Sequence, residues 1–203
     1  MRLIIAGLIV IVAIIVVLAI MLGGFLRPGS AQRSSVSLQA SPHATLTANP
    51  SSTPVILHVG DPAPNFTLAT LADDRMISLS DYRGKPVILN FWSINCSNCL
   101  KDIPLLEKLY TTQQGAGKTF IIFGINTDSS DSFVDVARFQ EQQHITYPFI
   151  VDDHYQARTL YGVTNTPSYY FIDRQGIIRA IVNGPLDTTL LHKDSEQIGI
   201  TTS

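Results

Sequence analysis

The chain is poor in several residue types, and each shortage narrows what it can do. Its 203 residues include only two cysteines and one tryptophan, charged residues make up 15%, and the net charge is −2. The lysines and arginines are scattered rather than gathered in a basic stripe, which argues against a nucleic-acid partner. The histidines show no spacing typical of metal ligands, and we expect all of them on the surface or in loops: His43, His58, His144, His154 and His192. The sequence therefore predicts neither a metal site nor a cofactor.

One segment is unusually rich in apolar residues. Residues 3–22 read LIIAGLIVIVAIIVVLAIML without a single charge. A helix of about 20 residues, rising 1.5 Å per residue, spans the roughly 30 Å hydrocarbon core of a bilayer. We therefore predict one N-terminal transmembrane helix within residues 1–27. A cleaved signal peptide is the alternative, but its apolar region is normally about 7–15 residues long, and the only candidate cleavage site, at residues 29–31, lies well beyond the run.

The segment after the apolar run predicts a tether rather than a domain. Residues 28–54 are rich in Ser, Thr, Ala and Pro, carry one Arg and no acidic residue, and offer little that could pack. We expect residues 28–58 to form a flexible linker that reaches roughly 30 Å and has no role beyond distance. Arg2 on one side of the apolar run is balanced by Arg27 and Arg33 on the other, so the charges leave the orientation in the membrane open.

From residue 59 onwards, apolar runs alternate with turn signals, the pattern of an α/β domain. Short apolar runs predict strands at residues 87–92, 119–125, 149–151, 169–172 and 177–182. One helical face follows the first run, in Leu100, Ile103, Leu106 and Tyr110, and a second helix is expected between the second and third strands. The last two strands are separated by a tight turn at residues 173–176, which predicts a hairpin. Residues 59–203 therefore predict one α/β domain with a central mixed sheet and helices on both faces.

The two cysteines lie where a predicted strand meets a predicted helix. Cys96 would be the N-cap of the helix and Cys99 would lie about one turn inside it. A helix N-terminus presents unpaired N–H groups and a partial positive charge, which stabilises a thiolate, the nucleophilic form of cysteine. We therefore predict that Cys96, with a pKa below the free value of about 8.5, attacks disulfides and that Cys99 resolves the mixed disulfide.

Three alternatives for the cysteine pair are weaker. A structural disulfide that closes so short a loop constrains the unfolded chain little. A zinc site needs two further ligands, and the sequence has no second CxxC or paired histidines. Two inert, buried cysteines would be unexpected at a junction between a strand and a helix. A CxxC pair that follows an apolar strand, in a strand–helix–strand unit, favours redox chemistry.

Four further motifs accompany the cysteines: GDPAPNFTL at residues 60–68, LSDYRGKP at 79–86, LNFW at 89–92, and Thr166-Pro167 leading into Phe171-Ile172-Asp173. Together, over residues 60–198, they resemble the TlpA/ResA-type membrane-anchored thiol–disulfide oxidoreductases, within the wider thioredoxin and AhpC/TSA-like group. The resemblance implies a thioredoxin-like fold with an added N-terminal hairpin and an inserted strand–helix segment between its two halves.

Two positions near the cysteines depart from the pattern of this family. Trp commonly precedes the first cysteine, where this chain has Asn95, and Pro often lies between the cysteines, where this chain has Ser97-Asn98. Both positions tune the redox potential. The departures leave the reaction class intact and the potential open.

The resemblance also implies how a substrate is bound. Pro167 would be cis, pack beside the cysteines and keep metals off the thiols, while Thr166 would offer its backbone to an incoming chain. From the sequence alone, a trans proline at the start of an edge strand is the alternative. We count Trp92 with these two residues in the substrate-binding region, where it would shield the cysteines as part of the core.

Asp102 is the candidate for proton transfer. It lies three residues after Cys99 and therefore on the same side of the helix. The family often has Glu here, and a partly buried carboxylate with a raised pKa could exchange the proton of Cys99. Asn90 takes the place where cytosolic thioredoxins carry a buried Asp, which strengthens this assignment. The alternative is an ordinary acidic residue that the helix dipole stabilises.

These residues predict an enzyme that reduces or exchanges disulfides in other proteins, such as apocytochrome c, with a membrane thiol-electron donor as a further partner. A peroxiredoxin shares the stretch at residues 61–68 and has a Ser where Ser93 lies, but its motif needs a Pro where this chain has Leu89. A Cu(I) chaperone spaces its cysteines by three residues and adds a distal His, whereas the spacing here is two.

We expect the cysteine domain on the extracytoplasmic side of the cell membrane. Almost nothing precedes the apolar run, which suits a signal anchor, and the Ser/Thr/Pro-rich linker suits a spacer outside the membrane. The resembling family works in that compartment, where disulfides persist. A chain with only two cysteines, both catalytic, has no spare thiol that could mispair there.

Overall fold

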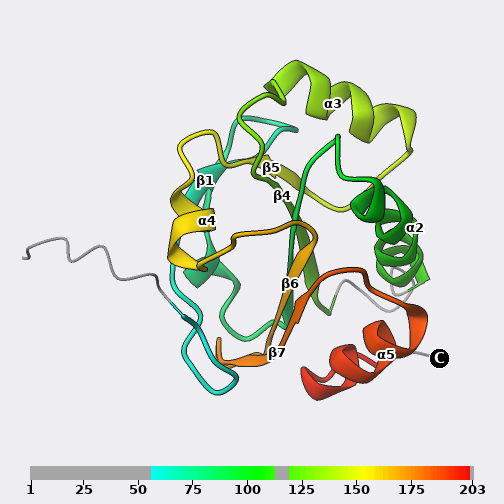
Figure 1. Ribbon diagram of the computed structural model, residues 1–203. Coiled ribbons are helices and arrows are strands. Elements are labelled where there is room, and N and C mark those ends of the chain that lie inside the picture. The colour runs from blue at the N-terminus through cyan, green and yellow to red at the C-terminus, as the bar shows by residue number, and fades with distance from the viewer. Residues whose placement is uncertain (1–55, 113–118, 202–203) are drawn as a thin grey trace, which may run out of the picture. The chain divides into compact units, whose positions relative to one another are not determined.

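The computed structural model describes residues 56–112 and 119–201, and the fold is given for these residues (Figure 1). The predicted transmembrane helix and most of the predicted linker, residues 28–58, lie outside them. Within the described ranges, no helix is long and apolar enough to cross a membrane.

A five-stranded mixed sheet forms the centre of the domain, with the strand order β5-β4-β3-β6-β7. The strands are β3 (Val87–Trp92), β4 (Ile121–Asn126), β5 (Phe149–Val151), β6 (Ser168–Ile172) and β7 (Ile178–Asn183). β3, β4 and β5 run parallel, whereas β6 pairs antiparallel with both β3 and β7. All residues of β3 are buried, which explains why its sequence is a continuous apolar run. Each of the five predicted strands is present, with small shifts at the ends.

Helices cover both faces of this sheet, as predicted (Figure 1). The core on one face contains side chains of α2 (Ser97–Thr112), α3 (Phe133–Gln142) and α5 (Thr188–Gln197). The core on the other face contains side chains of α4 (Gln156–Leu160) and of the 3₁₀ helix η2 (Leu79–Tyr82). The start of α2 therefore lies where β3 ends, next to both cysteines, and its apolar residues, including Ile103 and Leu106, pack against the sheet.

An N-terminal hairpin extends the domain, as the family resemblance implied. Its strands, β1 (Thr67–Ala69) and β2 (Met76–Ser78), pair antiparallel. Directly after β1, Thr70 bridges to Ile150 and the Leu71 amide donates to the Phe149 carbonyl at 3.1 Å. The hairpin thus covers the outer edge of β5, which would otherwise present unpaired backbone groups.

The predicted turn between β6 and β7 is stabilised by its own side chains. Asp173 Oδ1 accepts the backbone amides of Gln175 and Ile177, both at 2.9 Å. Gly176 has a φ of 78°, and a Cβ at this position would lie 0.9 Å from the Arg83 guanidinium. The left-handed conformation favours glycine, and a Cβ would also displace the tip of Arg83.

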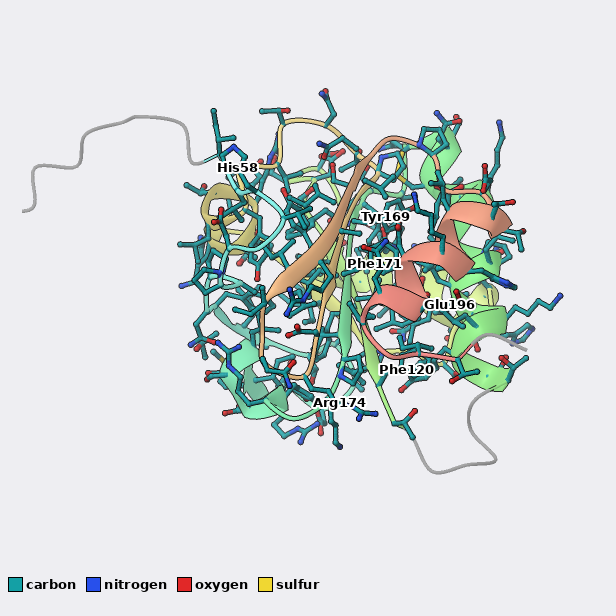
Figure 2. All side chains as sticks on the ribbon, turned by 90° about the horizontal axis from the view of Figure 1, so that it is seen from below. His58, Phe120, Tyr169, Phe171, Arg174 and Glu196 are labelled. Atoms are coloured by element: carbon teal, nitrogen blue, oxygen red, sulfur yellow. A yellow bond between two sulfur atoms is a disulfide. The ribbon has the colours of Figure 1, made fainter. Side chains whose placement is uncertain are left out.

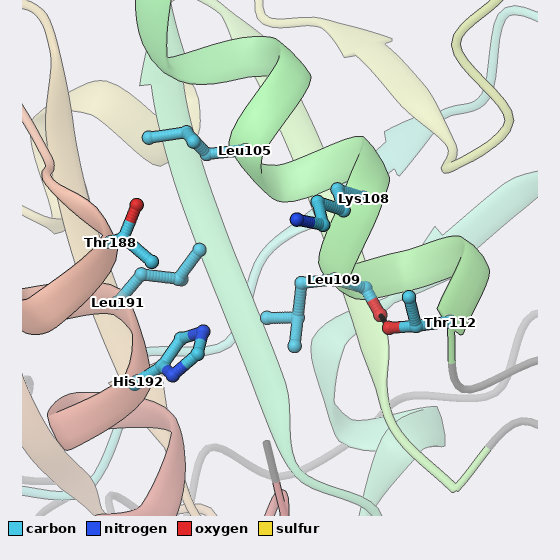
Figure 3. Close-up of a pocket in the computed structure, with 7 residues that line it drawn as sticks. All are labelled: Leu105, Lys108, Leu109, Thr112, Thr188, Leu191 and His192. Carbon is cyan, nitrogen blue, oxygen red and sulfur yellow. Dashed lines mark hydrogen bonds between the residues drawn. The ribbon is translucent and has the colours of Figure 1, made fainter. Parts of the chain in front are cut away.

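α5, which the apolar periodicity did not reveal, packs beside α2 (Figure 3). Asp187 begins the helix, since its side chain accepts the Leu190 amide. Leu191 of α5 and Leu109 of α2 line a small crevice of about 140 Å³ between the two helices. His192 lies at this crevice and is exposed, consistent with its predicted surface position.

Candidate redox site

The cysteine pair lies where β3 passes into α2. The helix begins at Ser97, so Cys96 is the residue before it, and the Leu100 amide donates to the Cys96 carbonyl at 3.1 Å. The Cys99 amide donates to Cys96 Sγ, also at 3.1 Å. The sulfur therefore occupies the position of an N-cap side chain, as predicted. The two cysteines form a disulfide with their Cα atoms 5.2 Å apart.

The two sulfurs differ in accessibility. Cys96 is half-buried, whereas only 1% of Cys99 is exposed. An incoming protein can therefore reach Cys96 but not Cys99. This asymmetry fits an attacking Cys96 and a resolving Cys99.

A buried aspartate that the sequence did not single out fixes the loop before the cysteines. Asp131 Oδ2 accepts the Ile94 amide at 2.8 Å and Asn126 Nδ2 at 2.7 Å. The Cys96 amide in turn donates to the Ser93 carbonyl at 3.3 Å. The only signal in the sequence was the position of Asp131 after the strand next to β3, which does not reveal a partner in another loop.

Trp92 belongs to the core of the domain. Its side chain is 0% exposed and packs in the same cluster as Cys99. Its ring centroid lies 4.7 Å from that of Phe149 and 5.1 Å from that of Phe139. The complete burial of this ring beside Cys99 agrees with the predicted core position, and its part in substrate binding stays a prediction.

Thr166 and Pro167 lie near the loop that precedes the cysteines. The peptide bond between them is cis, as the resemblance implied. Pro167 is buried and Thr166 is half-buried. Thr166 and Ser93 line one polar hollow of about 240 Å³, together with Arg158. The fold therefore brings the predicted substrate-binding backbone close to the redox loop.

Asp102 is almost completely buried on the inner side of α2, with 3% of its surface exposed. Its Oδ2 accepts the Tyr169 hydroxyl at 2.8 Å and the Leu186 amide at 2.9 Å. Burial raises the pKa of Asp102, and the Leu186 amide, the Tyr169 hydroxyl and the Lys101 charge only partly oppose it. Asp102 is therefore a buried carboxyl group one turn beyond Cys99, with a pKa displaced towards neutrality.

Comparison with known proteins identifies the family of this domain. The sequence model of the AhpC/TSA family matches residues 59–181. The chain belongs to the AhpC/TSA family. This match covers the hairpin, the redox loop, strands β3 to β6 and the first part of β7.

Among relatives of this AhpC/TSA-family chain are bacterial redox proteins. Thiol-disulfide oxidoreductase ResA of Geobacillus thermodenitrificans is 31% identical over 140 residues, which are 69% of this chain and 78% of the relative. The thioredoxin-like protein YneN of Bacillus subtilis is 33% identical over 138 residues, 68% of this chain and 76% of the relative. The predicted kinship with ResA-type proteins and the predicted thiol–disulfide oxidoreductase activity are confirmed.

Solved structures agree with this fold. A thiol:disulfide interchange protein DsbE from Chlorobium tepidum superposes with a TM-score of 0.62 and 27% identity, covering 70% of this chain and 99% of that structure. The thioredoxin domain of a thiol-disulfide oxidoreductase from Bacteroides vulgatus gives 0.61 and 26%, with the same coverages. The family member described here therefore has the thioredoxin-like fold that the sequence predicted.

Proposed function

We propose that this enzyme reduces or exchanges disulfides in proteins outside the cytoplasm, with Cys96 as the nucleophile, Cys99 as the resolving thiol and Asp102 as the proton acceptor. The asymmetry of the cysteine pair carries the proposal. Cys96 is half-buried and its sulfur accepts a hydrogen bond from the Cys99 amide, whereas only 1% of Cys99 is exposed. A donor directed at Cys96 Sγ stabilises a thiolate there, and burial restricts Cys99 to attack within the domain.

The reaction begins with the dithiol form of the enzyme. The Cys96 thiolate attacks one sulfur of the substrate disulfide, forms a mixed disulfide and releases the other substrate sulfur as a thiolate. Cys99 then loses its proton to Asp102 and attacks Cys96 Sγ. The Cys96–Cys99 disulfide forms, and the second substrate sulfur leaves and takes up a proton from solvent. Two electrons pass from the cysteine pair to the substrate.

Substrate binding is proposed at the backbone of Thr166, beside the cis-Pro167. The polar hollow that Thr166 shares with Ser93 lies on the same part of the surface as the loop that carries Cys96. An extended segment of an exported protein, such as apocytochrome c, would bind there through its own backbone. Specificity would then depend on the access of one cysteine to Cys96.

The assignment of roles is tested by trapping. In the Cys99→Ser variant the mixed disulfide forms but cannot be resolved, so partner proteins are expected to remain attached to Cys96. In the Cys96→Ser variant none should be trapped, because Cys99 is buried. The variants are expressed at equal levels, and trapped species are separated without reductant. Equal trapping by both variants would contradict the assignment.

Residues 1–27 are proposed to anchor the domain, and residues 28–58 to tether it outside the cytoplasm. The uncharged run at residues 3–22 supports the anchor, and a dithiol enzyme in an oxidising compartment needs a membrane thiol-electron donor to return it to the reduced state. A membrane-impermeant thiol reagent added to intact, mildly reduced cells should label Cys96. The variant lacking both cysteines gives the background. Labelling only after the membrane is broken would place the domain in the cytoplasm.

A further inference from the structure

The inner end of the proposed proton path contains a second ionisable side chain, Tyr169. Its hydroxyl reaches Asp102 Oδ2 at 2.8 Å, from strand β6 to helix α2. The Leu186 amide, from the segment before α5, reaches the same oxygen at 2.9 Å. Two donors from two elements therefore fix one oxygen of the carboxyl group, and neither donor belongs to the helix that carries Asp102.

The side-chain alternation of β6 directs this tyrosine towards α2. Tyr169 of β6 lies opposite Asn90 of β3. Like Phe171, it belongs to the core on the side of the sheet that α2 and α5 cover (Figure 2). The next residue, Tyr170, belongs to the opposite core, where its hydroxyl donates to the Tyr161 carbonyl at 2.6 Å. Adjacent buried tyrosines thus have equivalent hydroxyl bonds, but only one of them reaches the carboxyl group.

The protonation states leave the direction of this hydrogen bond unambiguous. Burial, followed by the charge of Asp102, raises the pKa of Tyr169 far above its ordinary value, so the phenol stays neutral and donates its proton. The groups that act on Asp102 are the Leu186 amide, the Tyr169 hydroxyl and Lys101 on its own helix, and all three favour the carboxylate against burial. Tyr169 therefore stabilises the ionised form, the only form that can accept a proton.

We propose that Tyr169 is a positioning residue of the redox reaction: its hydroxyl holds Oδ2 of Asp102 so that the other oxygen is presented to the thiol of Cys99. The inference rests on the proposed function of Asp102. The proton moves from Cys99 Sγ to the carboxylate, the Cys99 thiolate forms the bond to Cys96 Sγ, and the substrate sulfur leaves with the electron pair of the broken disulfide. Tyr169 keeps its own proton throughout.

The perturbation that separates this role from packing is Tyr169→Phe, which removes one oxygen atom. Without the Tyr169 hydroxyl, the Asp102 carboxylate loses one hydrogen-bond donor, so the pKa of Asp102 rises further. Asp102 can accept a proton only when it is ionised, so the rate falls at low pH. The acid limb of the rate–pH profile is therefore expected to move by about one pH unit to higher pH, with rates on that limb about tenfold lower. Tyr170→Phe is the matched control, because it removes the equivalent hydroxyl on the opposite face.

A second variant keeps the aromatic packing and reverses the expected shift. Ring fluorination makes the phenol of Tyr169 more acidic and hence a stronger donor to Asp102. Replacing Tyr169 alone by a fluorotyrosine is therefore expected to move the acid limb to lower pH. A residue that acted only by filling space would give no shift in either variant.

The assay is a single turnover of the reduced full-length chain with an excess of a disulfide-bonded peptide, in which release of the second peptide thiol is followed from pH 5 to 9. Opposite shifts for phenylalanine and fluorotyrosine at position 169, with no shift for Tyr170→Phe, would support the proposal. If Asp102→Asn abolishes the acid limb while both variants at position 169 retain the native profile, the role of Tyr169 is refuted and that of Asp102 stands. If Asp102→Asn keeps the native profile, the proton step of the proposed function fails, and this inference fails with it.

Discussion

Reduction of the Cys96–Cys99 disulfide should lower the thermal stability of the domain by a small and calculable amount. The bridge joins residues separated by three positions, so it removes little freedom from the unfolded chain. The loop-closure relation for a loop of about four residues gives about 2 kcal/mol in favour of the oxidised form at 25 °C. For a domain of about 150 residues, this corresponds to a melting temperature about 6 °C lower after reduction.

A second effect opposes the first when Cys96 is ionised. The Cys99 amide that donates to Cys96 Sγ would stabilise a thiolate by about 1.5–3 kcal/mol. The partial positive charge at the N-terminus of α2 would add about 0.3–1 kcal/mol. We propose that the pKa of Cys96 is lower in the folded state than its unfolded value of about 8.5. The stabilisation of the thiolate is then complete above the unfolded pKa and is lost as the pH falls through the folded pKa. The two effects are similar in size, so pH decides which prevails.

The measurement is thermal unfolding of both redox forms of the full-length chain at pH 5 and at pH 8. At pH 5 the thiols carry protons and only the loop effect acts, so the oxidised form should melt at about 6 °C above the reduced form. At pH 8 the difference should shrink. The variant with serine at both cysteine positions is the control, because reductant cannot change it. A reduced form that melts higher at pH 5, or a difference that stays constant to pH 8, would refute the reasoning.

Three further predictions concern single side chains. Asp102→Asn should gain stability relative to the native chain as the pH rises from 4 to 8. The pKa of Asp102 is raised in the folded state, so ionisation above the unfolded value of 3.8 disfavours the native fold. Urea unfolding measures this, and a stability difference that does not change with pH would contradict it. Gly124→Ala should cost about 1–3 kcal/mol in the same assay, because its Cβ would lie 2.6 Å from the Phe149 ring; unchanged stability would mean that the ring moves freely. Asp131→Ala should cost about 1–3 kcal/mol and slow exchange, since it leaves the Ile94 amide without its acceptor, whereas Asp153→Ala, at an exposed site, should do neither.

The sheet and the cysteine helix could be predicted because their sequence patterns are strong. β3 is buried on both sides and reads as an unbroken apolar run, and the apolar positions of α2 recur at helical spacing. α5 was missed because its sequence, TTLLHKDSEQ, has two adjacent leucines and no apolar periodicity. Its one local signal is Asp187, whose side chain caps the helix, but an aspartate after a Pro-Leu pair is also common in loops.

The family resemblance implied the distant Thr166 and Pro167, but residue spacing alone could predict the site only where its residues are neighbours in sequence. Cys96 directly precedes the helix that carries Cys99 and Asp102, so their spacing defines their relative placement. Tyr169 reads as part of an apolar strand, and alternation alone could assign it to a face but not to a partner 67 residues away. Asp131 and Ile94 are 37 residues apart and meet through loops. Contacts of this kind depend on how the helices are placed over the sheet, which no local pattern encodes.

The partners of Asp102 distinguish it from Asp173, the buried aspartate in the turn between β6 and β7. Asp173 is also buried, and burial alone would raise its pKa, but the Ile177 amide and the ion pair with Arg179, at 2.6 Å, outweigh burial and hold that pKa below its ordinary value. The hydrogen-bond donors to Asp102 are both neutral, and neutral donors stabilise a carboxylate less than a guanidinium does. Asp102 can therefore gain and lose a proton without breaking an ion pair. Asn90 of β3 cannot titrate, so the proposed acceptor for the proton of Cys99 is Asp102, three residues further along α2.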